Sequence, residues 1–145
     1  KLTDFYLMLA ARNEHIKKKI NKLKKKKTVL LCDRFTDSTH CYQVVGNGID
    51  SKINKINNDY IIGKIKPNLT IVLKSNLNII SRRVKQRKNN NKFDNLKKNF
   101  YNSVQNEFIK LASLKKNYVI YDSSHNDNEL EKKILKTVKK RLKIK

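Results

Sequence analysis

The sequence predicts an α/β fold built on a parallel sheet, and three observations lead to this prediction. Short apolar runs of strand length recur along the chain, at 28–32, 69–73 and 118–121. Segments with apolar residues at helical spacing lie between them, and helices that alternate with strands are typical of a parallel sheet covered by helices. Glycine (3) and proline (1) are scarce, which suits long helices. A length of 145 residues predicts a single domain over 1–145.

The first predicted element is a helix over 3–26. Its apolar residues fall near helical spacing, and Thr3 or Asp4 can cap its start. The helix ends in lysines, which are favourable at the negative end of the helix dipole. The apolar run TVLLC at 28–32 follows. Its position between helices predicts a parallel strand buried on both faces, with Cys32 as a small core residue.

The rest of the chain keeps the alternation of helix and strand. Further helices are expected over 36–44, 51–63, 76–87, 94–116 and 128–143. The apolar residues that share one stripe of the fourth of these are Phe100, Val104, Phe108 and Leu111. A Gly-Asn-Gly turn at 46–48 follows the helix expected over 36–44.

The formal net charge of +23 raises the question of a nucleic-acid partner. The excess is nearly all lysine, it is spread along the chain, and asparagine and isoleucine are abundant with it. These three residues rise together when coding DNA is rich in A and T. We therefore favour compositional bias, and we expect no specific nucleic-acid partner. The charge should still speed the encounter with anionic nucleotides.

Cysteine usage and hydropathy bear on the cellular compartment. The two cysteines form no CxxC pair, which is typical of a reduced, cytoplasmic protein. No apolar stretch approaches the ~20 residues of a membrane span, so no membrane partner is expected. The sequence has no cluster of histidine, cysteine and carboxylate residues with metal-ligand spacing, and no metal-ligating residues are assigned.

The segment DRFTDSTHCYQ, at 33–43, concentrates polar chemistry directly after the first predicted strand. Ligands of open α/β sheets bind at the carboxyl ends of the strands. Arg34 can hold a phosphate with two parallel hydrogen bonds. Hydroxyl and amide groups in the segment suit a base edge or a sugar, and Tyr42 offers a flat wall with a polar tip. The segment therefore predicts a pocket for a small phosphorylated ring compound.

The same segment resembles the signature of bacterial-type thymidylate kinases, and the rest of the chain lies in register with that family. The other matching segments are YLMLAAR at 6–12, VVGNGID at 44–50, KPNLTIVL at 66–73, RRVKQRKNNNKFD at 82–94 and YVIYDSS at 118–124. The resemblance implies a P-loop-kinase-like fold, a three-layer parallel sheet with flanking helices, and a lid at approximately 85–95. It also implies a homodimer, for which the helix 3–26 is a candidate interface.

The resemblance implies phosphoryl transfer from ATP, with Mg²⁺, to thymidine monophosphate, which yields thymidine diphosphate for dTTP synthesis. Arg34 would bind the acceptor phosphate, and Asp33 would lie near the metal and the transferred group. Arg87 and Lys92 would come down with the lid onto the donor phosphates. Residues expected to bind the substrate are Met8, Arg12, Ser38, Thr39, Tyr42 and Gln43. Among these, Arg12 would hydrogen-bond thymine, and Tyr42 would pack under the deoxyribose.

Four departures from the family pattern modify this expectation. Met8 stands where a phenylalanine usually stacks on thymine, and Lys92 stands where the lid usually has arginine. Lys74 replaces an acid at the end of a strand, and the sequence suggests no role for it. The 145 residues also contain no GxxxxGK(S/T) loop, which cradles donor phosphates and follows the central strand of this fold. We therefore expect a chain without that strand and loop, and without kinase activity on its own.

Three alternatives remain open from the sequence. One is a related kinase acting on another nucleotide or a deoxynucleoside, which substrate preference would separate. A second is a basic nucleic-acid-binding protein, which would bind with a steep salt dependence and no nucleotide preference. The third is an inactive remnant of a kinase.

Overall fold

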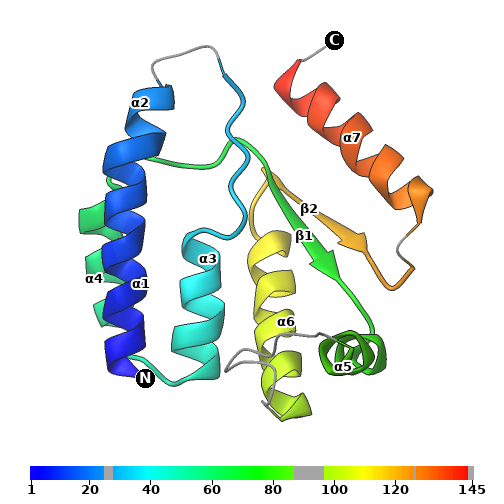
Figure 1. Cartoon of the computed structure of the whole chain (residues 1–145), viewed down its shortest axis with the longest axis horizontal. Helices are drawn as coiled ribbons and strands as arrows, with labels where there is room; N and C mark the ends of the chain where they lie inside the picture. The colour runs from blue at the N-terminus through cyan, green and yellow to red at the C-terminus, as the bar shows by residue number, and fades with distance from the viewer. Residues whose placement is uncertain (25–27, 87–96, 126, 144–145) are drawn as a thin grey trace. The chain divides into compact units, whose positions relative to one another are not determined.

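The computed structural model describes residues 1–24, 28–86, 97–125 and 127–143. These residues form two compact units, Lys1–Ile65 and Lys66–Lys145. The elements, shown in Figure 1, are the helices of the first unit, α1 to α4, followed by β1, α5, α6, β2 and α7 in the second. The single domain remains a prediction, and the two units are described in turn.

The first unit begins with a long continuous helix. It comprises α1 (Leu2–His15), a π-helical segment η1 (Ile16–Ile20) and α2 (Asn21–Lys24). The expected helix is confirmed up to residue 24, and residues 25 and 26 lie outside the described part of the chain. The predicted cap is wrong, because the helix starts at Leu2, before Thr3 and Asp4, and no side chain caps it. Asp4 lies in the first turn instead, where its charge favours the helix dipole.

The apolar run at 28–32 is not a strand in the structure, and that prediction is wrong. Cys32 is exposed rather than part of a core, and the side chains of Val29 and Leu31 are 54% and 98% exposed. A buried strand needs neighbouring strands for its backbone groups and covering layers for its side chains. The described residues of Lys1–Ile65 contain no other strand that could pair with it.

Two further helical segments complete the first unit. α3 (Thr36–Thr39) continues into the π-helical η2 (His40–Gly46), which confirms the helix expected over 36–44 and extends it by two residues. Gly48 has φ +74°, which lets the chain turn into α4 (Ser51–Ile62), as expected. The Asp50 carboxylate caps α4 by accepting hydrogen bonds from the backbone N–H of Lys52 (2.6 Å) and Ile53 (3.3 Å). α4 packs against α1.

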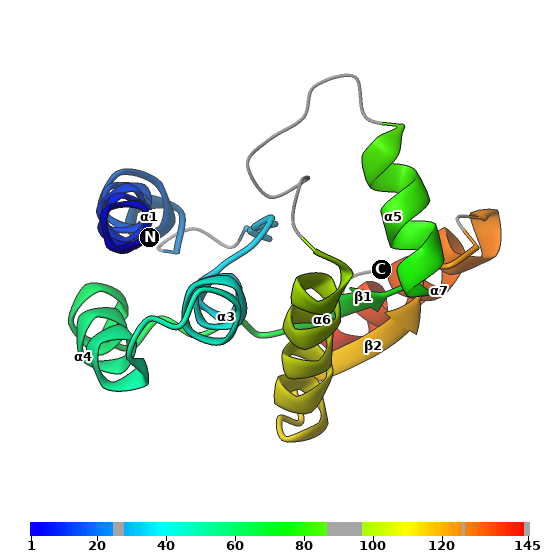
Figure 2. The ribbon, with the colours of Figure 1, turned by 90° about the horizontal axis from the view of Figure 1, so that it is seen from below.

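The second unit contains two parallel strands, β1 (Thr70–Lys74) and β2 (Tyr118–Asp122). Their register pairs Thr70 with Tyr118 and Lys74 with Asp122. The helices are α5 (Leu77–Lys85), α6 (Lys98–Ser113) and α7 (Asn128–Leu142). α6 packs against both strands, as Figures 1 and 2 show.

The buried apolar residues of the second unit are Val72 on β1, Val104 and Ala112 on α6, and Leu130 on α7. Both expected strands of this half and its three expected helices are confirmed, although residues 87 and 94–96 of the predicted helices lie outside the described part. The predicted α/β class, with a parallel sheet and flanking helices, is therefore confirmed. None of the helices that the structure describes is long and apolar enough to span a membrane.

Candidate functional site

Arg34 sits at the turn between the exposed run 28–32 and α3. Its φ of 66° lies in the left-handed region, which non-glycine residues adopt rarely and at a cost of about 1–2 kcal/mol. The guanidinium carbon lies 4.9 Å from the centroid of the Tyr42 ring, within the range of a cation–π contact. Backbone conformations of this kind are frequent at functional sites. The turn thus brings together two residues that the sequence predicted to share a pocket.

Arg12 connects α1 to the same turn. One guanidinium nitrogen, Nη2, donates a hydrogen bond to the Phe35 carbonyl oxygen at 3.2 Å, and the guanidinium carbon lies 5.8 Å from the Phe35 ring centroid. The other nitrogen, Nη1, is buried and has no partner among the described residues. Burial lowers the pKa of Arg12 from its ordinary value, and the nearby Cys32 thiol opposes that shift. Arginine stays charged in proteins, so the site contains a partly desolvated cation.

Gln43 links η2 to α1 from a fully buried position, with 0% exposure. Its Nε2 donates to the Met8 Sδ at 3.4 Å, and its Oε1 accepts a hydrogen bond from the Asn47 Nδ2 at 2.8 Å. Thr39, on α3, is also buried, and its Oγ1 has no partner among the described residues. Buried polar groups are nearly always hydrogen-bonded, so Thr39 Oγ1 and Arg12 Nη1 are both exceptions within one unit.

The structure brings several predicted residues into direct pairs: Met8 with Gln43, and Arg34 with Tyr42. Ser38 is half-buried at the start of α3, and its backbone N–H donates to the Phe35 carbonyl oxygen at 3.2 Å. Asp33 is exposed. Arg87 and Lys92, the predicted lid cations, lie outside the described residues. The roles assigned to all of these residues stay predictions.

Two residues of this constellation were missed by the sequence analysis. Phe35 provides both the carbonyl oxygen and the ring that hold Arg12. Asn47 fixes the Gln43 side chain. Its position four residues after Gln43 could have been a signal, because side chains at that spacing meet on one helix face. For Phe35, nothing in the sequence indicated a contact with a residue 23 positions earlier.

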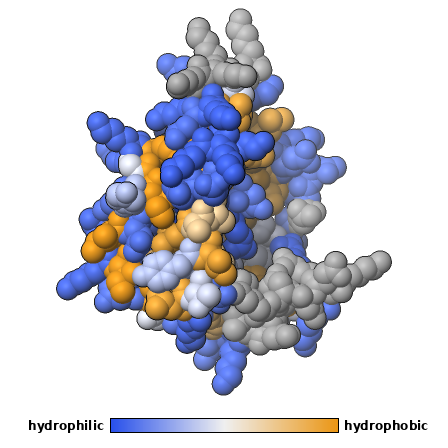
Figure 3. All heavy atoms as spheres, turned by 60° about the vertical axis from the view of Figure 1, so that its left-hand side comes forward, coloured by the Kyte–Doolittle hydropathy of each residue, from blue (hydrophilic) through white to orange (hydrophobic). Residues whose placement is uncertain are grey.

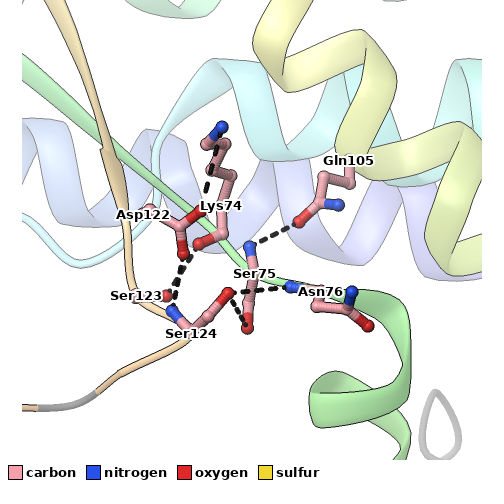
Figure 4. A network of polar contacts seen from close by, with 7 residues as sticks. All are labelled: Lys74, Ser75, Asn76, Gln105, Asp122, Ser123 and Ser124. Atoms are coloured by element: carbon pink, nitrogen blue, oxygen red, sulfur yellow. Dashed lines mark hydrogen bonds and ion pairs between the residues drawn. The ribbon is translucent and has the colours of Figure 1, made fainter.

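A second polar cluster lies at the carboxyl ends of β1 and β2 (Figure 4). The Lys74 Nζ lies 3.8 Å from an Asp122 carboxylate oxygen, across the register pair. The Ser124 N–H donates to Asp122 Oδ1 at 2.8 Å, and the Ser75 N–H donates to Gln105 Oε1 at 2.9 Å. Lys74, to which the sequence gave no role, is therefore one half of an ion pair.

The hydrogen bonds from Ser124 lower the pKa of Asp122 below its ordinary value, and the charge of Lys74 adds to that effect. Arg83 donates through Nη2 to the carbonyl oxygens of Ser123 (2.8 Å) and Ser124 (3.3 Å). These bonds tie α5 to the end of β2.

The described residues do not form a protein-held metal site. They contain no group of three or more histidine, cysteine or carboxylate side chains able to hold a metal ion. Two hollows in the described part of the chain are lined by residues other than the predicted acceptor residues. One lies between α5 and α6, and the other lies along Leu2, Thr3, Tyr6, Leu7 and Ala10 of α1.

Comparisons with known proteins bear directly on identity. The family model "Thymidylate kinase" matches residues 1–134. A thymidylate kinase of Ehrlichia ruminantium (strain Gardel) is 35% identical over 144 residues, which cover 96% of this chain and 68% of that protein. One of Mycoplasmoides gallisepticum is 32% identical over 124 residues, which cover 85% of this chain and 59% of that protein.

A solved structure supports the fold. The crystal structure of thymidylate kinase from Ehrlichia chaffeensis matches with a TM-score of 0.68 at 23% identity, over 95% of this chain and 65% of that one. The chain thus spans between 59% and 68% of the length of these similar proteins. Because the family model covers nearly all of the sequence, the chain belongs to the thymidylate kinase family.

Proposed function

We propose that this chain carries the acceptor site of a thymidylate kinase, an enzyme that transfers a phosphoryl group from ATP to thymidine monophosphate and releases thymidine diphosphate. Family membership supports the reaction, and the contacts within Lys1–Ile65 support the place of the acceptor. The site lies between α1 and the segment from Arg34 to Gln43.

The observation that carries the proposal is the pair of buried polar atoms without partners, Arg12 Nη1 and Thr39 Oγ1. A buried donor or acceptor without a partner costs about 1–3 kcal/mol. Both atoms belong to residues predicted to bind the substrate. A third such atom, Asn58 Oδ1 on α4, lies outside the predicted site. A pyrimidine presents carbonyl oxygens and a ring N–H, so it can accept a hydrogen bond from an arginine and form one with a hydroxyl group at the same time.

In this proposal each residue contacts a different part of the acceptor, thymidine monophosphate. Arg34 binds the phosphate with a bidentate, charge-assisted contact, and its stacking on Tyr42 holds the guanidinium in place. Tyr42 forms the wall under the sugar. Met8 takes the place of a stacking phenylalanine, and the hydrogen bond from Gln43 fixes its thioether. These residues position the acceptor and neutralise its charge, which is the main protein contribution to phosphoryl transfer.

The assignment of ATP as the phosphoryl donor rests on family membership alone. ATP, generally with Mg²⁺, supplies the phosphoryl group when it is bound, and Arg87 and Lys92 are the proposed cations against its phosphates. The described residues do not fit a magnesium site, because their carboxylates do not cluster. The 145 residues also contain no GxxxxGK(S/T) loop.

A homodimer and a cytoplasmic location belong to the same proposal. α1 exposes Leu2 (50%), Tyr6 (46%) and Leu7 (64%), which line a hollow of about 470 Å³. Figure 3 shows apolar side chains among hydrophilic ones on one face of the molecule. An apolar stripe of this kind on a helix suits a helix–helix interface. The two cysteines are free, as in a reduced compartment.

Calorimetric titration of the chain with nucleotides tests the acceptor site. Thymidine monophosphate should bind more tightly than uridine monophosphate. Arg34→Gln should weaken the binding of thymidine monophosphate about tenfold or more, because a charge-assisted contact is lost, and should leave the binding of thymidine unchanged. Lys24→Gln removes the same charge from an exposed position of the same unit and is the control. Equal losses in both variants, or equal binding of both nucleotides, would contradict the proposal.

A further inference from the structure

Asn47, the residue that follows η2, begins a relay of two hydrogen bonds that runs through Gln43 to Met8 on α1. The Asn47 Nδ2 donates to the Gln43 Oε1 at 2.8 Å, and the Gln43 Nε2 donates to the Met8 Sδ at 3.4 Å. Gln43 is fully buried, whereas Asn47 and Met8 are half-buried. The relay therefore links the end of η2 to the thioether that the proposed function places against the acceptor.

The thioether fixes the direction of both hydrogen bonds. Its sulfur carries lone pairs and no hydrogen, so Met8 can only accept. Gln43 must therefore turn its amide nitrogen towards Met8, which turns its amide oxygen towards Asn47. An amide oxygen also only accepts, so residue 47 has to supply a donor, as the Asn47 Nδ2 does. An acceptor at position 47 would favour the reversed amide of Gln43, with oxygen facing the Met8 sulfur.

The backbone around Gln43 is held independently of this relay. The Ile49 N–H donates to the Gln43 carbonyl oxygen at 2.9 Å, and the Gly48 N–H donates to the Val44 carbonyl oxygen at 2.9 Å. These bonds do not involve the Asn47 side chain. What the Asn47 side chain sets is therefore the orientation of the Gln43 amide, and through it the restraint on Met8.

A methionine has three rotatable bonds and adapts its shape readily. Ordering such a side chain when a ligand binds costs affinity, and a restraint already present in the free protein reduces that cost. We propose that Asn47 is a positioning residue for the nucleobase of the acceptor, acting through Gln43 to hold Met8 in place before the nucleotide binds. This inference rests on the proposed function, because it takes Met8 as the residue that lies against the base.

The test uses the fact that the 145 residues contain one methionine. In a chain labelled with [methyl-¹³C]methionine, the Met8 methyl resonance is assigned by its loss in Met8→Leu. Asn47→Asp keeps the shape of asparagine and replaces the donor with an acceptor. This variant should shift the Met8 resonance of the free protein and weaken thymidine binding about three- to tenfold in calorimetry. Thymidine is the probe because it has no phosphate for the new carboxylate to repel.

Asn47→Ala removes the donor without adding an acceptor, so the Gln43 amide can keep its orientation. It should shift the Met8 resonance and weaken thymidine binding less than Asn47→Asp does. A role in packing alone predicts the reverse order, because alanine deletes atoms that aspartate keeps. The matched control is Asn57→Asp, which adds the same charge to the same unit and removes an amide that donates to the Ile53 carbonyl oxygen. It should leave the resonance and the affinity unchanged.

The outcomes separate this inference from the proposed function. If the parent chain binds thymidine and Asn47→Asp binds it equally well, the acceptor site stands and the positioning role is overturned. A larger effect of Asn47→Ala than of Asn47→Asp, or a Met8 resonance unshifted in both variants, overturns it as well. If the parent chain binds neither thymidine nor thymidine monophosphate, the proposed function itself is refuted, and the positioning role with it.

Discussion

Gln43 is the residue through which the structure predicts the largest effect on the candidate site. It is fully buried, and it holds Met8 on α1 and Asn47 at the end of η2. Gln43→Ala should lower the free energy of unfolding by about 2–4 kcal/mol. Of this, about 1–3 kcal/mol comes from the lost hydrogen bond and the Asn47 donor left without a partner. The remainder comes from the cavity left by the buried side chain.

Gln43→Leu separates these two contributions, because leucine fills most of the volume and makes no hydrogen bond. It should cost about 1–2 kcal/mol, less than Gln43→Ala. Gln86→Ala removes an exposed glutamine side chain and should change stability by less than about 0.5 kcal/mol. Urea unfolding followed by circular dichroism measures all three. If Gln43→Ala and Gln86→Ala unfold at the same urea concentration, Gln43 does not anchor η2 to α1, and the geometry of the acceptor site is refuted.

Three further predictions concern charge, assembly and activity. The pKa of Asp122 lies below its ordinary value, so the contribution of Asp122 to stability is present above the unfolded pKa and is lost as the pH falls through the folded pKa. An NMR titration of the Asp122 carboxyl group should show the lowered pKa, and Ser124→Ala should raise it. An unchanged pKa in Ser124→Ala would contradict the assignment of the shift to the Ser124 hydrogen bonds. Leu7→Glu on α1 should shift a dimer towards monomer in sedimentation while Lys17→Glu does not, and a monomeric parent chain would remove the basis for the interface. The 145 residues alone should form no ADP from ATP and thymidine monophosphate in a coupled assay, and turnover abolished by Arg34→Gln would contradict this.

The parts of the fold that depend on local patterns could be predicted from the sequence. The short apolar runs of β1 and β2 and the helical spacing of apolar residues in α6 are local patterns, each contained within one element. Val104, which belongs to the predicted apolar stripe of α6, is buried in the structure. The candidate acceptor residues were also recognisable, because Arg34, Tyr42 and Gln43 lie within one short segment. In that segment the chain itself limits how far apart the side chains can be.

Features that depend on a distant partner could not be predicted in the same way. The run at 28–32 has a strand's composition, but it stays exposed because no strand in the described part of its unit pairs with it. Lys74 forms an ion pair with Asp122, which the parallel register of β1 and β2 places opposite it. Arg12 finds Phe35 23 positions away. The sequence by itself determined the helices, the two paired strands and the family. The tertiary structure decided which apolar run pairs, which polar atoms are buried and which charges meet, because hydrogen bonds and ion pairs depend on distances that only the folded chain sets.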